Sequence, residues 1–215
     1  LQVLPMRQSA KLEFFYDCSS PWTYFAFARL VPLAEELGQT IQWRPILVGG
    51  VFNSINPQLY AARESMFANE RRVKHYFKDM QDWSAYVGIT VQQPDVFPVN
   101  SVKGMRGAIY AAEHDLIATY SRALFAAYWG DNRDISTPEV LLDVGVSSGL
   151  DKDHFMAAIA DQRYKDQLRD NTEELVARGG FGSPTLFIND DDMYFGNDRL
   201  PLVESRLKQL LSQPQ

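Results

Sequence analysis

The chain has 215 residues, of which 46% are hydrophobic and 22% are charged, a composition typical of one globular domain, alone or with a sizeable insertion. The formal net charge of −6 argues against nucleic acid or an acidic membrane surface as a partner, because both favour a basic protein face. No apolar run reaches the roughly 18 residues that a membrane span requires, and residues 1–10 contain no apolar segment of signal-peptide length. We therefore expect no membrane partner.

Cysteine and histidine are both scarce. The single cysteine, Cys18, excludes an internal disulfide and a Cys-x-x-Cys redox pair, and it suits a reducing compartment. We therefore expect a cytoplasmic protein. The three histidines, at positions 75, 114 and 154, are too far apart in the sequence for metal-ligand spacing, so no metal is predicted.

The chain begins with a strand–helix–strand pattern. Residues 12–16 (LEFFY) form a short, almost wholly apolar run, which is typical of a buried parallel strand. A helix is predicted over 22–37, with Gly38 as its C-terminal stop. A second strand with alternating polarity is predicted over 40–44. Two strands joined through a helix indicate a parallel pair with a right-handed crossover.

The middle of the chain follows a helical period, and its end returns to strands. Helices are predicted over 58–86, 101–118, 120–129, 138–147, 152–160 and 164–179. Strands are then predicted over 184–188 and 193–195, joined by a turn of strong turn-formers, and a last helix over 199–211.

The order of these elements predicts the fold class. Without the helical block, the order is β-α-β followed by β-β-α, which is that of a thioredoxin fold. The prediction is therefore an α/β protein with a discontinuous thioredoxin-like core, over 11–56 and 172–212, and a large all-helical insertion domain over 57–171.

The turn between the first strand and the first helix is the main candidate site. Its sequence is Ser20-Pro21-Trp22-Thr23. Ser is a favoured N-cap, Pro is favoured at the first helical position, and the N–H groups of a helix N-terminus attract an anion. Thiol redox proteins carry Cys-x-x-Cys at this corner, whereas Ser20 and Thr23 carry hydroxyls. The corner is therefore predicted to stabilise a thiolate that the protein does not supply; Ser20 as a simple N-cap is the alternative.

Five motifs, in order along the chain, resemble those of a known family. They are 17–24 (DCSSPWTY), 43–52 (WRPILVGGVF), 97–101 (FPVNS), 181–187 (FGSPTLF) and 195–200 (FGNDRL). Together they look like the motifs of 2-hydroxychromene-2-carboxylate isomerases. The kappa-class glutathione transferases share much of the pattern, and both groups belong to the DsbA-like branch of thioredoxin folds. The resemblance implies glutathione as the cofactor and Ser20 as the catalytic residue that stabilises its thiolate.

The resemblance also implies a set of cofactor-binding residues. Asn56 matches an asparagine that contacts glutathione. Ser183 and Pro184 match a residue whose backbone pairs with glutathione and the cis-proline that follows it, with an ordinary trans-proline as the alternative. Asn197 and Asp198 match residues at the γ-glutamyl end of glutathione, and capping of the last helix is their other interpretation.

Two tryptophans are candidates for the substrate pocket. Trp22 follows the serine–proline corner, and an aromatic platform there suits an aromatic carboxylate. Trp129 ends a predicted insertion helix and is a second candidate for substrate binding, although a large aromatic residue at helical spacing is more often part of a core.

The function implied by the resemblance is a glutathione-dependent isomerase of aromatic hydrocarbon catabolism. It would interconvert 2-hydroxychromene-2-carboxylate and trans-o-hydroxybenzylidenepyruvate, or act on a related intermediate, and the family implies a homodimer. One alternative keeps the thiolate in a kappa-class-like glutathione transferase or peroxidase. Another is a redox-inactive thioredoxin-like binding module, which the absence of Cys-x-x-Cys permits.

Overall fold

The computed structural model describes residues 10–55 and 68–212, and the structural statements below concern these residues. The elements follow in the order β1 (Leu12–Tyr16), α1 (Pro21–Glu36), β2 (Ile41–Pro45), α2 (Val48–Ile55), α4 (Glu70–Val87), α5 (Val102–Ala112), α6 (Ile117–Phe125), a π-helical turn η1 (Ala126–Gly130), α7 (Pro138–Ser147), α8 (Lys152–Ala160), α9 (Gln162–Ala177), β3 (Thr185–Ile188), β4 (Asp192–Phe195), a 3-10 turn η2 (Asn197–Arg199) and α10 (Leu200–Ser212).

The sheet has the order β2-β1-β3-β4 among the described residues. β1 and β2 are parallel, in register from Leu12 opposite Ile41 to Tyr16 opposite Pro45. β3 is antiparallel to β1 and to β4. The predicted fold class, a β-α-β and β-β-α core with a helical block between its halves, is therefore confirmed.

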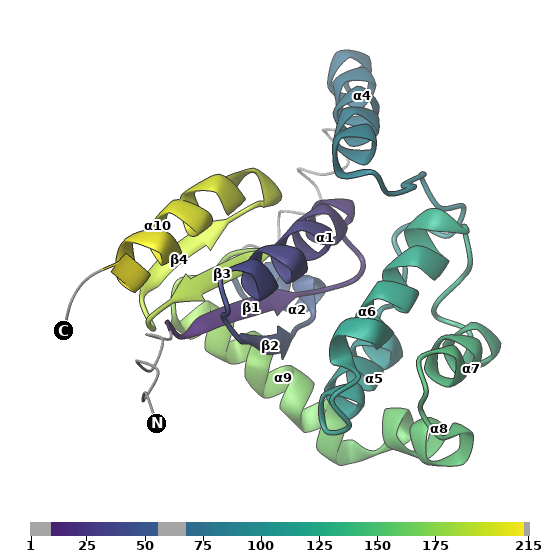
Figure 1. Cartoon of the computed structure of the whole chain (residues 1–215). Coiled ribbons are helices and arrows are strands. Elements are labelled where there is room, and N and C mark those ends of the chain that lie inside the picture. Colours follow the sequence, from purple (N-terminus) through teal and green to yellow (C-terminus); the bar gives the residue numbers. More distant parts are fainter. Residues whose placement is uncertain (1–9, 56–67, 213–215) are drawn as a thin grey trace, which may run out of the picture.

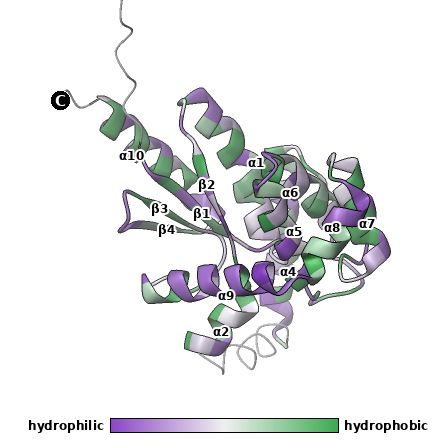
Figure 2. Cartoon of the chain, turned by 90° about the horizontal axis from the view of Figure 1, so that it is seen from below, coloured by the Kyte–Doolittle hydropathy of each residue, from purple (hydrophilic) through white to green (hydrophobic). Residues whose placement is uncertain are grey.

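The sheet lies between two layers of helices. Figures 1 and 2 show α1 and α10 on one of its faces and α2 and α9 on the other. The helices α5 and α6 lie beside the β2 edge, and α4 stands next to α1 (Figure 1). The helical block therefore covers the end of the sheet at which β1 leads into α1.

Alternating side chains of β1 enter two separate cores. Leu12, Phe14 and Tyr16 pack in the larger core, which α1 and the helical block share, whereas Phe15 packs in a smaller core beneath α2 and α9. This alternation follows from the two-residue period of a strand. It explains why the run reads as almost wholly apolar, since a central strand is covered on both faces.

The structure differs from the predicted helices at two places. The segment 48–55, whose glycine pair gives no helical period, forms α2. The single helix predicted over 101–118 is two helices, because α5 ends at Ala112 and the chain turns through Asp115, which has a left-handed backbone (φ 58°). For the helix predicted over 58–86, the structure describes α4, and residues 58–67 lie outside the described part.

The predicted division into a core and an insertion domain stays a prediction. Helix α9 runs unbroken through its second boundary, between Asn171 and Thr172. The same helix joins the two parts, since Asn171 donates from its amide to the Pro45 carbonyl at 2.9 Å. The next residue, Thr172, bonds within the predicted core, where its hydroxyl accepts from the Leu47 N–H at 3.0 Å.

Candidate active site

A cavity of about 880 Å³ lies at the end of the sheet where β1 and β2 finish and β3 begins. Four segments line it, within 17–22, 47–52, 97–102 and 181–183, together with Phe195 of β4 and two residues of α4. Most of these residues are apolar. Among the described lining residues, the charged ones are Asp17 and Arg72.

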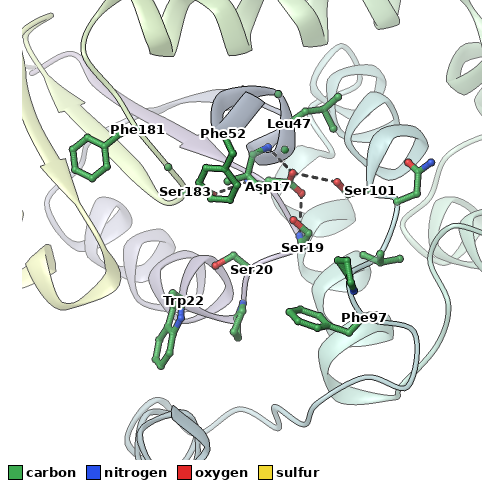
Figure 3. A pocket seen from close by; sticks show the side chains of 18 of the residues that line it. Asp17, Ser19, Ser20, Trp22, Leu47, Phe52, Phe97, Ser101, Phe181 and Ser183 are labelled. Atoms are coloured by element: carbon green, nitrogen blue, oxygen red, sulfur yellow. Dashed lines mark hydrogen bonds between the residues drawn. The ribbon is translucent and has the colours of Figure 1, made fainter. Parts of the chain in front are cut away.

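Ser20 stands at the N-terminus of α1 on the wall of this cavity (Figure 3). Its backbone is extended (φ −113°, ψ 128°), and its Oγ accepts a long hydrogen bond of 3.4 Å from the Thr23 N–H. Because the hydroxyl accepts from the main chain, its proton is left to donate to a group in the cavity. The hydroxyl and the positive end of α1 together can hold an anion. The predicted N-cap role of Ser20 is confirmed, and it coexists with a place in the cavity.

Thr23, the second hydroxyl residue of the corner, does not line the cavity. It is fully buried, and its Oγ1 lies 2.8 Å from the Oγ of Ser183. Ser183 Oγ also accepts from the Asp17 N–H at 3.0 Å. The Ser183–Pro184 peptide bond is cis, as predicted. These contacts fix the loop before β3 against the first turn of α1.

Asp17 is a buried carboxylate at the junction of three loops. One oxygen accepts from the Ser19 N–H at 3.0 Å; the other accepts from the Val48 N–H at 2.9 Å and from the Ser101 hydroxyl at 3.2 Å (Figure 3). Burial raises the pKa of Asp17, and the donated hydrogen bonds oppose that rise in part. The carboxylate therefore ties the starts of α1, α2 and α5 around one point on the cavity wall.

Sequence reasoning did not single out Asp17, although a signal was present. A carboxylate that directly follows a wholly buried strand, three residues before an N-cap, is expected to be buried as well. Its partners on α2 and α5 are 31 and 84 residues away in the chain, so no local pattern could have identified them. A second cis bond, Phe97–Pro98, also lies in this lining and was not predicted.

The two candidate tryptophans have different places. Trp22 is half-buried, lines the cavity and is directed away from the Ser20 hydroxyl (Figure 3). Trp129 is fully buried and is not part of the cavity lining. Its Nε1 donates to the carbonyl of Cys18 at 2.8 Å, so it supports the β1–α1 turn from within the core. Trp129 therefore lies outside this cavity, and its contact with substrate stays a prediction.

Two other predicted cofactor-binding residues, Asn197 and Asp198, lie outside this lining. Asn56 lies outside the described residues. Asn197 is buried in η2, where its carbonyl accepts from Arg29 at 3.0 Å, and Asp198 is exposed and pairs with Arg199 at 2.7 Å. Neither Asn197 nor Asp198 lines the cavity, so their contact with glutathione stays a prediction.

Cys18 is not suited to thiol chemistry. It is fully buried, and burial, followed by the nearby Asp17, raises the pKa of its thiol well above the ordinary value. Over residues 10–55 and 68–212, no group of three or more His, Cys, Asp or Glu side chains could hold a metal ion. In the same part of the chain, no helix has the length and apolarity to cross a membrane.

The chain is similar to a family of known proteins over nearly its whole length. Residues 11–208 match the model of the DSBA-like thioredoxin domain. A 2-hydroxychromene-2-carboxylate isomerase of Pseudomonas putida is 32% identical over 94% of this chain and 96% of its own. The glutathione S-transferase kappa 1 of Homo sapiens is 26% identical over 89% of this chain and 88% of its own.

Solved structures show the same relationship. The structure of a 2-hydroxychromene-2-carboxylate isomerase has a TM-score of 0.80 at 26% identity and covers 94% of this chain and 96% of its own. A probable DsbA oxidoreductase of Streptomyces coelicolor has a TM-score of 0.81 at 18% identity and covers 96% and 92%, which is a likeness of fold alone. The relatives that are named as isomerases support the conclusion that this chain is an enzyme. The chain therefore belongs to the DSBA-like thioredoxin-domain family, among the relatives of the 2-hydroxychromene-2-carboxylate isomerases.

Proposed function

We propose that the chain is a glutathione-dependent isomerase that interconverts 2-hydroxychromene-2-carboxylate and trans-o-hydroxybenzylidenepyruvate, or a related intermediate of aromatic catabolism. The observation that carries this proposal is the position of Ser20, a hydroxyl at the N-terminus of α1 on the wall of a cavity of about 880 Å³. The identity of 32% to a protein named as such an isomerase supports the reaction class.

The residues of the cavity suit a peptide cofactor with a thiol. The hydroxyl of Ser183 is engaged by Asp17 and Thr23, so the residue offers its main chain to the cavity. Within the described residues, no backbone hydrogen bond joins that main chain to another segment. An extended peptide can pair with such a segment. When bound, glutathione would supply a sulfur nucleophile whose reversible addition turns a conjugated double bond into a single bond that can rotate.

The contribution of Ser20 is electrostatic. Its hydroxyl would donate to a sulfur anion, and the N-terminus of α1 favours the same negative charge. A hydrogen bond to a charged group is worth about 1.5–3 kcal/mol. These interactions would lower the pKa of a bound thiol from its ordinary value of about 8.5.

Ser20 variants test this role while keeping stability separate from chemistry. Ser20→Ala removes both the hydroxyl and the N-cap, with a stability loss of about 1 kcal/mol, whereas Ser20→Gly removes the hydroxyl but costs only about a few tenths. With the chromene carboxylate and glutathione, an absorbance assay should show that both variants lose at least about tenfold in kcat/KM, which is about 1.4 kcal/mol in the barrier. Ser20→Thr, which keeps both functions, should restore part of the rate. A Ser20→Gly enzyme with the wild-type rate contradicts the proposal.

A glutathione transferase is the second candidate, because a kappa-class enzyme is 26% identical over 89% of the chain. The same cavity and the same Ser20 would serve it. Glutathione is consumed in conjugation or peroxide reduction but is recovered unchanged from an isomerisation. Titration of free thiol during turnover therefore separates the two. The homodimer and the cytoplasmic location stay predictions.

A further inference from the structure

A second, smaller cavity of about 350 Å³ adjoins the first. Its lining is Trp22, Arg71, Arg72, His75, Tyr76 and Asp79. Trp22, Arg72 and Tyr76 line both cavities, so the two spaces meet along these side chains. A ligand at this boundary would lie between the start of α1, which carries Ser20, and the face of α4.

The shared residues combine aromatic surface with a cation. The rings of Trp22 and Tyr76 meet edge to face, with centroids 5.7 Å apart and an interplanar angle of 85°. Arg72 precedes Tyr76 by one helical turn, so both lie on one face of α4. The ion pair within α4 joins Lys78 to Asp82, and none of the described carboxylates pairs with Arg72.

The charges around Arg72 also favour an anion. Arg72 is the only cation among the described residues that line the larger cavity. Arg71 and His75 lie beside it in the lining of the smaller cavity. The carboxylate of Asp79 lines the smaller cavity but not the larger one. The larger cavity is at the upper end of the range of about 300–1,000 Å³ for a single ligand, so it has room for a second reactant next to a bound peptide.

We propose that Arg72, Trp22 and Tyr76 form the subsite for the second substrate, a planar aromatic carboxylate whose ring lies against the two aromatic side chains and whose carboxylate pairs with Arg72. This inference rests on the proposed function. Trp22 and Ser20 line the same cavity, so a ring held against Trp22 shares that space with the sulfur nucleophile. Arg72 thereby determines specificity for charged over uncharged acceptors.

A binding experiment without glutathione tests the subsite apart from turnover. The probes are coumarin-3-carboxylate and uncharged coumarin, titrated into the full chain and followed by fluorescence. The wild type should bind the carboxylate more tightly than coumarin. Arg72→Gln should weaken binding of the carboxylate by about twofold to fivefold, a modest effect because Arg72 is exposed. Coumarin binding should not change, and Arg72→Lys should retain part of the preference.

Lys74→Gln is the matched control, because Lys74 is an exposed cation of α4 that lines neither cavity. It removes the same charge and should leave both probes unaffected. The inference is overturned if Arg72→Gln and Lys74→Gln behave alike, if the wild type binds the two probes equally, or if it shows no saturable binding of the carboxylate.

Calorimetry with glutathione separates this inference from the proposed function. Arg72→Gln should leave the affinity for glutathione unchanged and raise KM for the chromene carboxylate. Weaker glutathione binding at an unchanged KM for the chromene would assign Arg72 to a carboxylate of glutathione and overturn the inference, while the proposed function would stand. A wild type that binds coumarin-3-carboxylate but turns over no chromene would contradict the function and leave the subsite intact.

Discussion

The buried charge of Glu13 allows a sharp test of what stabilises the sheet. Glu13 is the one polar residue of β1 apart from the tyrosine that ends it, and it is fully buried. Its carboxylate lies 2.8 Å from Arg178, 3.0 Å from Arg44 and 3.3 Å from Lys11. The guanidinium of Arg178 also stacks on the ring of Phe187, 3.9 Å from its centroid. A buried carboxylate is tolerated only when paired in this way.

Glu13→Gln keeps the shape of the side chain and removes its charge. Breaking a buried ion pair costs about 3–5 kcal/mol, but the side chains of Arg178 and Arg44 are 20% and 30% exposed and can be partly hydrated. We therefore expect a loss of about 2–3 kcal/mol in the free energy of unfolding at pH 7, measured by urea denaturation, and a fall in Tm of about 5–10 °C. Glu174→Gln, a half-exposed carboxylate on the same arginines, is the control and should cost under about 1 kcal/mol.

The difference between Glu13→Gln and the wild type should depend on pH. Burial acts to raise the pKa of Glu13, but the hydrogen bonds and charges of Arg178 and Arg44 outweigh it, so the pKa is lowered from the ordinary value of 4.5. A lowered pKa in the folded state means that the stabilisation is fully present above about pH 4.5 and is lost as the pH falls through the folded-state value. A difference that is equal at pH 7 and at pH 3.5, or below about 0.5 kcal/mol at pH 7, refutes this reasoning.

The corner around Ser20 gives three further tests. Asp17→Asn should lower the free energy of unfolding in urea by about 1–3 kcal/mol, because its amide group would face N–H donors. An unchanged stability would contradict the role of Asp17 in holding these segments together. Trp129→Phe should lower the free energy of unfolding by a similar amount, because it leaves the Cys18 carbonyl unpaired. KM for the chromene should not change, and a raised KM would instead support the prediction that Trp129 binds substrate. Cys18 should react with a thiol reagent such as dithionitrobenzoate only after unfolding; rapid native-state labelling refutes its burial.

Local patterns in the sequence determined most of the secondary structure and the first corner of the site. Three of these patterns act on neighbouring residues: the apolar run of β1, the Ser20-Pro21 N-cap and the turn-formers after β3. Their effect can therefore be predicted from the sequence. The order of the strands then left few possible topologies. The hydroxyl residues Ser20 and Thr23, in the place of Cys-x-x-Cys, predict a sulfur that comes from outside the protein.

Only the tertiary structure decided which distant residues share the cavity. The carboxylate of Asp17 meets Ser101 across 84 residues, and the ring of Trp22 in α1 meets that of Tyr76 in α4. Trp129 stands at the end of a predicted helix, where the sequence leaves its partner open, and folding places it beneath the β1–α1 turn. Contacts of this kind depend on how whole elements pack, because a side chain's periodicity gives its face on a helix but not the partner that covers that face.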